Sequence, residues 1–289
     1  MRPARTPPPV TVRRRRPVIA ALNYALLVIA AAAFVSPIAF MVAGSLKPDE
    51  RVLAEAGSWQ AVWPREASLQ NYRDVFDRVP FGRYFLNSVV ITGTIVLGGL
   101  VVNSLAGYAF ARLRWRGRDA LLGVVLALMV LPLQSIAVPL FYEVTILGWR
   151  DTYTAQILPF VANASAVYLF YSFFLGLPRE LEEAAWTDRA GMLRTFLEVV
   201  VPNAKPAFAT VAVVLFLFFW GLFLWPLLVT IGPEVRPLPV AIAHFQTLPP
   251  LKWGDIMAFG VMMVTPVLVL FLVFQRWFVQ GVAASGRKG

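Results

Sequence analysis

The sequence predicts an all-α integral membrane protein with six membrane-spanning helices, and three observations support this fold class. Hydrophobic residues make up 58% of the 289-residue chain and charged residues only 15%, whereas a soluble domain carries about 25% charged residues. The apolar residues form long continuous blocks, and about 20 apolar residues in a helix cross the hydrocarbon core of a bilayer. These blocks lack the alternation of apolar and polar residues that is typical of porin strands. Because backbone polar groups in lipid must bond to one another, we expect each block to be a helix.

Six blocks are long enough to be spans, and Asp255, at the edge of the last one, is their only charged residue. The expected spans are residues 18–43, 85–110, 120–142, 152–177, 206–231 and 255–275. They form one domain, 18–278, between a basic N-terminal arm at 1–17 and a short tail at 279–289. Several spans contain proline, including Pro132, Pro159 and Pro226. Proline indicates either helices that bend around a cavity or the ordinary tolerance of membrane helices for proline.

The net charge of +10 is distributed unequally between the two sides of the membrane. If the N-terminus lies inside, the inside segments contain 17 Lys and Arg residues and the outside segments contain 9. This asymmetry is the positive-inside pattern, and it places both termini in the cytoplasm. The charge therefore indicates orientation in a lipid bilayer, and we expect no nucleic-acid partner.

The chain lacks the residue patterns of several catalytic and metal sites. It has no cysteine, which excludes disulfides and thiolate metal sites. It contains neither the G-x-x-x-x-G-K-[ST] pattern of a phosphate-binding loop nor an H-E-x-x-H zinc motif. Its single histidine, His244, is expected to be an ordinary residue of an outside loop. We therefore expect no catalytic residue, no metal and no cofactor in this chain.

Residues 178–205 form the one inside segment that is both long and amphipathic. Pro178 suits the first turn of a helix, and the acids that follow it, Glu180, Glu182 and Glu183, suit the positive end of the helix dipole. Leu181, Ala184 and Ala185 then give a small apolar face at helical spacing. The pattern predicts two short helices that dock into a groove on another protein. The alternative is a helix lying on lipid, which three acids beside an anionic leaflet disfavour.

The same segment resembles the loop that defines the permease subunits of ABC importers. That family has Glu-Ala-Ala, then Gly four positions later, and Ile-x-Leu-Pro further on. The corresponding residues here are Glu183-Ala184-Ala185, Arg189 and Val199, Val201 and Pro202. The wider context resembles the carbohydrate branch of maltose and glycerol-3-phosphate permeases, through Ser45-Leu46-Lys47-Pro48, Asn71-Tyr72 and Asn87-Ser88.

This resemblance implies a permease subunit of an ATP-driven sugar importer in a prokaryotic cell membrane. Such a subunit forms half of a translocation pathway together with a second permease subunit. A cytoplasmic ATPase dimer, which binds the ATP and Mg, docks on the 178–205 coupling loop, and an extracytoplasmic sugar-binding protein delivers the substrate. The resemblance places the ATPase contact at Glu182, Glu183, Ala184, Ala185, Asp188, Arg189, Gly191 and Pro202, with Glu183 opposite a basic residue.

Arg189 departs from the family pattern, because a glycine between two short helices commonly supplies a positive φ angle. An arginine costs about 1 kcal/mol or more in that conformation. We therefore expect Gly191 to make the turn instead, which would extend the first helix by about half a turn. The alternative is that the turn stays in place and Arg189 is helical without strain.

Polar residues within the spans are candidates for the translocation path. They are Asn103, Gln134, Asn163 and Tyr168. Polar residues in spans commonly face the interior of a bundle, but they also form hydrogen bonds between helices, and both roles remain open. Because the spans contain no Lys or Arg, a binding site within the bilayer for a highly charged solute is disfavoured.

Two other classes of protein deserve comparison. An ion-coupled secondary transporter acting without an ATPase needs ion-coordinating groups at mid-membrane and often has internal repeats, and neither is evident. A membrane-embedded enzyme would need a cluster of acids or histidines near one face of the bilayer. Apart from Asp119, the inside acids lie in the 178–205 loop, and no histidine accompanies them, so this class is also disfavoured.

Overall fold

The computed structural model describes residues 17–285, with side chains for residues 21–274, and this part of the chain is helical without strands. In chain order the helices are α1 (Pro17–Ser45), α2 (Asp49–Ala54), the 3₁₀ turn η1 (Trp59–Val62), α3 (Gln70–Arg78), α4 (Phe81–Arg112), α5 (Arg118–Leu128), α6 (Leu133–Ile146), α7 (Tyr153–Val161), α8 (Ala164–Leu175), α9 (Glu180–Thr187), α10 (Met192–Thr195), the π-helical turn η2 (Phe196–Val200), α11 (Val201–Asn203), α12 (Lys205–Trp220), α13 (Leu224–Val229), α14 (Leu238–Phe245) and α15 (Trp253–Ser285). The all-α fold predicted from the sequence is confirmed.

Four stretches of helix in the described part are long and apolar enough to cross a bilayer. They are Ala21–Ser45, Phe81–Arg112, Tyr153–Leu175 and Trp253–Phe274. Two bent pairs of helices raise the number to six. The predicted arm at 1–17 lies almost wholly outside the described residues, and α15 continues through Ser285 into the predicted tail.

The two bent pairs depart from the straight spans expected from hydropathy. Helices α5 and α6 meet at 102°, and Pro132 stands directly before α6 with extended backbone angles. Because proline disfavours a helical conformation in the residue before it, the predicted third span is broken there. The fifth span differs more, since α12 has only 16 residues, meets the 192–203 segment at 80° and is separated from α13 by residues 221–223.

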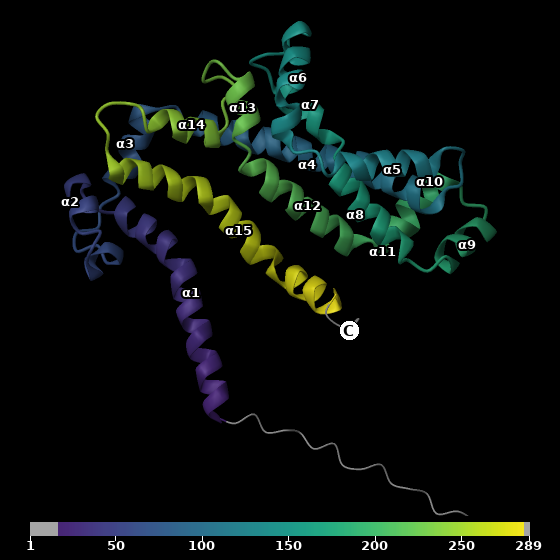
Figure 1. Cartoon of the computed structure of the whole chain (residues 1–289), viewed down its shortest axis with the longest axis horizontal. Helices are drawn as coiled ribbons and strands as arrows, with labels where there is room; N and C mark the ends of the chain where they lie inside the picture. The colour runs from purple at the N-terminus through teal and green to yellow at the C-terminus, as the bar shows by residue number, and fades with distance from the viewer. Residues whose placement is uncertain (1–16, 286–289) are drawn as a thin grey trace, which may run out of the picture.

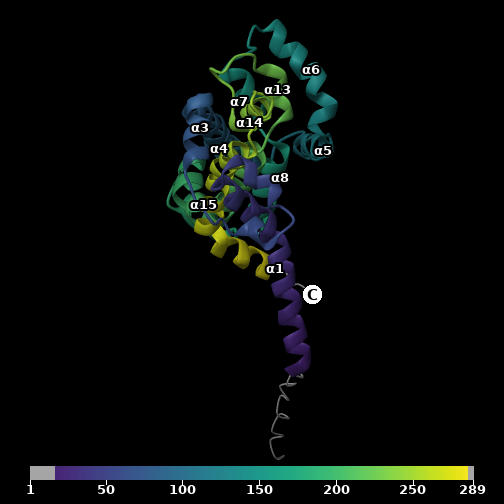
Figure 2. The same cartoon turned by 90° about the vertical axis from the view of Figure 1, so that its left-hand side faces the viewer.

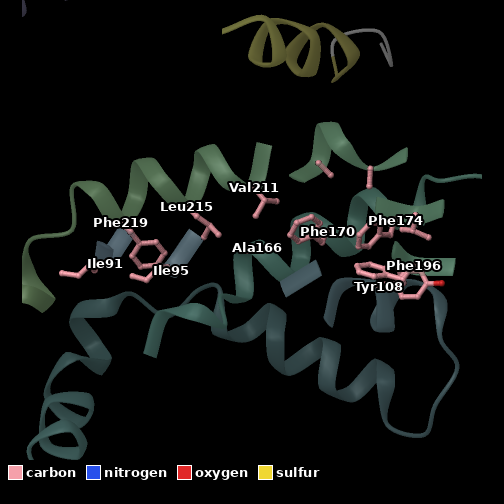
Figure 3. Close-up of a cluster of buried hydrophobic side chains, with 14 residues drawn as sticks. Ile91, Ile95, Tyr108, Ala166, Phe170, Phe174, Phe196, Val211, Leu215 and Phe219 are labelled. Carbon is pink, nitrogen blue, oxygen red and sulfur yellow. The ribbon is translucent and has the colours of Figure 1, made fainter. Parts of the chain in front are cut away.

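Helix α4 is the central helix of the bundle and packs against α7, α8, α12 and α14. Its approach to α8 depends on Gly107, because a Cβ atom there would lie 2.6 Å from Phe170 Cβ and 2.9 Å from the backbone nitrogen of Tyr171. Figure 3 shows the apolar core that results, with Ile91, Ile95 and Tyr108 of α4 facing side chains from α8, α12 and η2. Helix α4 is therefore in direct contact with most of the helices of the bundle.

Helix α9 lies at one end of this bundle, and α2 and α3 lie at the other (Figure 1). At the α3 end, Arg78 forms an ion pair of 2.8 Å with the buried Asp255 of α15 and donates hydrogen bonds to two carbonyls of the preceding loop. Asn71 donates to the carbonyls of Ser45 and Lys47 at 2.8 and 2.7 Å. These contacts fix the ends of α1, α3 and α15 together, while the start of α1 runs away from the other helices (Figures 1 and 2).

Candidate functional site

The 178–205 loop begins with α9, an eight-residue helix. Three acids, Glu180, Glu182 and Glu183, occupy its first turn, where the helix dipole stabilises negative charge. A turn follows α9, and the chain returns through α10, η2 and α11. The predicted pair of short helical segments is therefore present, although the second one contains a π-helical turn, a feature that is frequent at functional sites.

Arg189 makes the turn after α9, and the prediction that Gly191 makes it is wrong. The φ angle of Arg189 is +59°, in the left-handed region, whereas Gly191 is extended at φ −71° and ψ 162°. The Arg189 N–H donates to the Trp186 carbonyl at 3.0 Å, and the Ala190 N–H donates to the Ala185 carbonyl at 2.9 Å. These two bonds form a Schellman motif, which satisfies carbonyls at the end of α9. The hydrogen bonds offset the roughly 1–2 kcal/mol that a side chain costs in the left-handed region, so the turn stays where the family has glycine.

Most residues predicted to contact an ATPase lie on the surface of the loop. Glu183, Ala184, Asp188, Arg189, Gly191 and Pro202 are exposed, and Ala185 is partly exposed. Beside them, the four most exposed large apolar side chains of the loop are 49–63% exposed: Trp186, Met192, Leu193 and Leu197. We call these eleven residues the docking surface. Exposed apolar side chains beside charged ones are typical of a surface that a protein or a membrane covers.

Glu182 is the exception among the predicted contact residues, since only 4% of it is exposed. Its side chain turns away from the docking surface toward the end of α4. There Glu182 Oε2 lies 3.4 Å from Arg112 Nε, and the side chain of Arg112 is equally buried. Glu182 therefore does not belong to the docking surface.

Two of the four candidate translocation residues hold helices together in this structure. The Asn103 side chain, fully buried on α4, donates to the Val161 carbonyl at 3.0 Å and accepts from the Asn163 backbone N–H at 2.8 Å. The Asn163 side chain in turn accepts from the Ala166 N–H at the start of α8. Both residues thus join α4 to the interruption between α7 and α8, which is the interhelical role left open by the sequence.

The other two candidates are exposed and lie apart from this junction. Gln134 lies in the first turn of α6, directly after the bend at Pro132. Tyr168 of α8 is 38% exposed, and its ring lies 6.3 Å from that of Tyr171. The structure does not bring the four candidates together, and a role for any of them in translocation remains a prediction.

No group of three or more potential metal ligands among His, Cys, Asp and Glu occurs within the described residues. His244 is exposed near the end of α14.

Residues 95–284 match the family described as the binding-protein-dependent transport system inner membrane component. The match covers more than half of the chain and includes the whole 178–205 loop. The chain belongs to this family. It is accordingly a multi-pass membrane permease.

Relatives of known function resemble this permease over most of its length. The arabinooligosaccharides transport system permease protein AraQ of Bacillus subtilis is 32% identical over 89% of this chain and 91% of its own. The trehalose/maltose transport system permease protein MalG of Thermococcus litoralis is 33% identical over 78% of this chain and 82% of its own. The glycerol-3-phosphate permease protein UgpE of Yersinia pestis is 34% identical over 71% of this chain and 74% of its own.

A solved structure supports the fold of the permease independently. It is a bacterial ABC transporter involved in the import of the acidic polysaccharide alginate. The superposition has a TM-score of 0.80 and covers 94% of this chain and all of the other, at 23% sequence identity. The resemblance stated from the loop and the span-flanking motifs is thus confirmed.

Sequence reasoning missed two residues that position the loop of the permease. Arg112 was counted only as part of the inside positive charge, and Tyr108 was read as part of a span. One pattern could have drawn attention to Arg112. It directly follows the predicted span 85–110, on the side of the membrane where the acid-rich 178–205 loop is also expected.

Proposed function

We propose that this permease is one subunit of an ATP-driven carbohydrate importer and forms half of its translocation pathway with a second permease subunit. The observation that carries the proposal is the docking surface, which combines the family's Glu-Ala-Ala residues with exposed apolar side chains at one end of the bundle. The names of the three relatives add a substrate class, because all of them transport sugars or a phosphorylated polyol.

In this proposal the docking surface sits in a cleft of a cytoplasmic ATPase dimer, with Glu183 opposite a basic residue. Closure of the dimer on ATP displaces the loop, and the bundle alternates between inward and outward access. Such coupling requires that the loop make different contacts in the two states. ATP and Mg belong to the partner ATPase, and this chain holds no cofactor of its own.

The remaining partners follow from the orientation of the chain. We place both termini and the α9 end in the cytoplasm of a prokaryotic cell, on the basis of the positive-inside pattern. An extracytoplasmic sugar-binding protein then meets the opposite end, which carries α2, α3 and α14. The proposed substrate is a carbohydrate, consistent with spans whose interiors lack basic side chains.

Reconstitution tests this function. The purified chain alone should neither bind nor hydrolyse ATP, and the complex with its ATPase and second permease should take up sugar when the loaded binding protein is added. ATP turnover by the chain alone would contradict the proposal. Uptake by the chain alone, driven by an ion gradient in proteoliposomes, would instead support the secondary transporter.

Glu183→Lys gives the sharpest variant for this test. Glu183 is exposed in a loop, so the fold should be unaffected, whereas like charges in an interface cost several kcal/mol. Uptake should be lost. Asp119→Lys is the matched control, because it reverses the charge of an 82%-exposed acid in the first turn of α5 and should leave uptake intact.

A further inference from the structure

A buried ionic contact joins the coupling loop to the central helix of the bundle. Glu182 of α9 and Arg112 in the last turn of α4 approach to 3.4 Å, with 5% and 4% of their side chains exposed. Arg112 also donates a hydrogen bond to the carbonyl of Leu177, at the entry to the loop. One arginine therefore holds both the entry to the loop and its first helix. We call Arg112 and Glu182, together with Tyr108 one turn earlier on α4, the α4–α9 joint.

Tyr108 attaches the returning arm of the loop to the same turn of α4. It lies four residues before Arg112, and its ring is buried against Phe174 of α8 and Phe196 of η2, with centroids 5.9 and 5.1 Å away. Figure 3 shows these three rings gathered at one end of the core. Both arms of the loop are thus fixed to the end of α4.

Helix α4 contacts other helices of the permease along its length. Gly107, next to Tyr108, allows backbone contact with α8, and Asn103, one turn further along, bonds to the junction of α7 and α8. The opposite end of α4 is joined to the α14 region, where Asn87 donates to the carbonyls of Glu234 and Arg236. These contacts connect Arg112, through α4, with both ends of the bundle.

The α4–α9 joint is incompletely bonded in this conformation. Tyr108 Oη, Arg112 Nε and Glu182 Oε1 are buried and have no hydrogen-bond partner in the described part of the chain. The 3.4 Å separation exceeds the roughly 2.7–2.9 Å of a charge-assisted N–H···O bond. Buried polar groups without partners are costly, so a shorter contact between Arg112 and Glu182 would be more favourable.

We propose that the α4–α9 joint transmits the displacement of α9 to span α4, which makes Arg112 and Glu182 positioning residues for transport that act inside the permease. This inference rests on the proposed function, because it assumes that an ATPase displaces the docking surface. It assigns the two neighbouring acids different roles. Glu183 contacts the ATPase, and Glu182 transmits the displacement of α9 to α4.

The test uses the complete importer with Glu182→Gln and Arg112→Gln, and it measures both sugar uptake and ATP hydrolysis. Each variant should still co-purify with the ATPase, because the docking surface is unchanged. The number of sugars taken up per ATP hydrolysed should fall by about 5–150-fold, the range that typical coupling free energies give. Arg112→Lys keeps the positive charge and should recover part of this ratio.

The exposed pair Arg118–Asp119 supplies the control, and Asp119→Asn should match the unsubstituted importer. Normal uptake per ATP in Glu182→Gln would overturn the inference. Loss of ATPase co-purification in Glu182→Gln would also overturn it, because the pair would then serve assembly. Should the unsubstituted importer show no ATP-driven uptake, the proposed function itself would fail, and this outcome is distinguishable because it requires no variant.

Discussion

Arg189 shows how the position of a turn can be kept without glycine. The sequence predicted that an arginine would avoid the left-handed region, because the intrinsic cost of that conformation is evident from residue type alone. The compensating Schellman bonds from the Arg189 and Ala190 N–H groups depend on where α9 ends. Helix ends are the least reliable part of a prediction from sequence, so this compensation could not be predicted.

The backbone of Arg189 makes a direct prediction about stability. Arg189→Gly should be tolerated or slightly stabilising, and Arg189→Val should be less stable than Arg189→Gly by about 1–2 kcal/mol, because a β-branched side chain suits positive φ worst. Thermal unfolding of the purified chain measures the difference.

Arg73 provides a matched control for this series. It is exposed in the interior of α3, where the backbone is helical. Glycine should be less stable than valine there, because glycine has the lower helix propensity. The same order of stability at Arg73 and Arg189 would contradict the assigned strain. Gly191→Val, at a position with open space around an added Cβ, should be mild.

At the scale of elements, the spans could be predicted well and their interruptions poorly. Long apolar blocks identify helices such as α4 and α15, because hydropathy follows directly from composition. The break in α12–α13 at residues 221–223 lies inside a continuous apolar block, so hydropathy carries no information about it. Pro132 left a bend between α5 and α6 open as one of two alternatives, and its 102° angle could not be predicted. The contact between Arg112 and Glu182 could not be predicted either, because it depends on how separate helices pack against one another.

The packing of α4 on α8 can be tested with two glycines of the same helix. Gly107→Ala places a Cβ within 3.0 Å of backbone and side-chain atoms of α8, and overpacking of this kind costs about 1–3 kcal/mol. Gly93→Ala meets nothing within 4 Å and should gain up to about 1 kcal/mol from helix propensity. The two thermal midpoints should therefore shift in opposite directions, and shifts in the same direction would contradict the close approach.

For the whole molecule, the orientation proposed from charge places α9 and α3 on opposite sides of the membrane. The absence of native cysteine allows single cysteines to be labelled without background. Cysteines at Glu66 and Thr247, both exposed, should react in whole cells with a reagent that does not cross the membrane. A cysteine at the exposed Arg116 should react only after lysis. Labelling of position 116 in whole cells would reverse the orientation.

The central claim is that the docking surface binds the ATPase, and a cross-link tests it most directly. Ala184 is exposed at the centre of that surface, and Ala184→Cys can carry a photoreactive group in the assembled importer. Illumination should attach the ATPase covalently at position 184, and the same group at Glu66→Cys should attach none. An importer that takes up sugar but yields no adduct from position 184 would contradict the account.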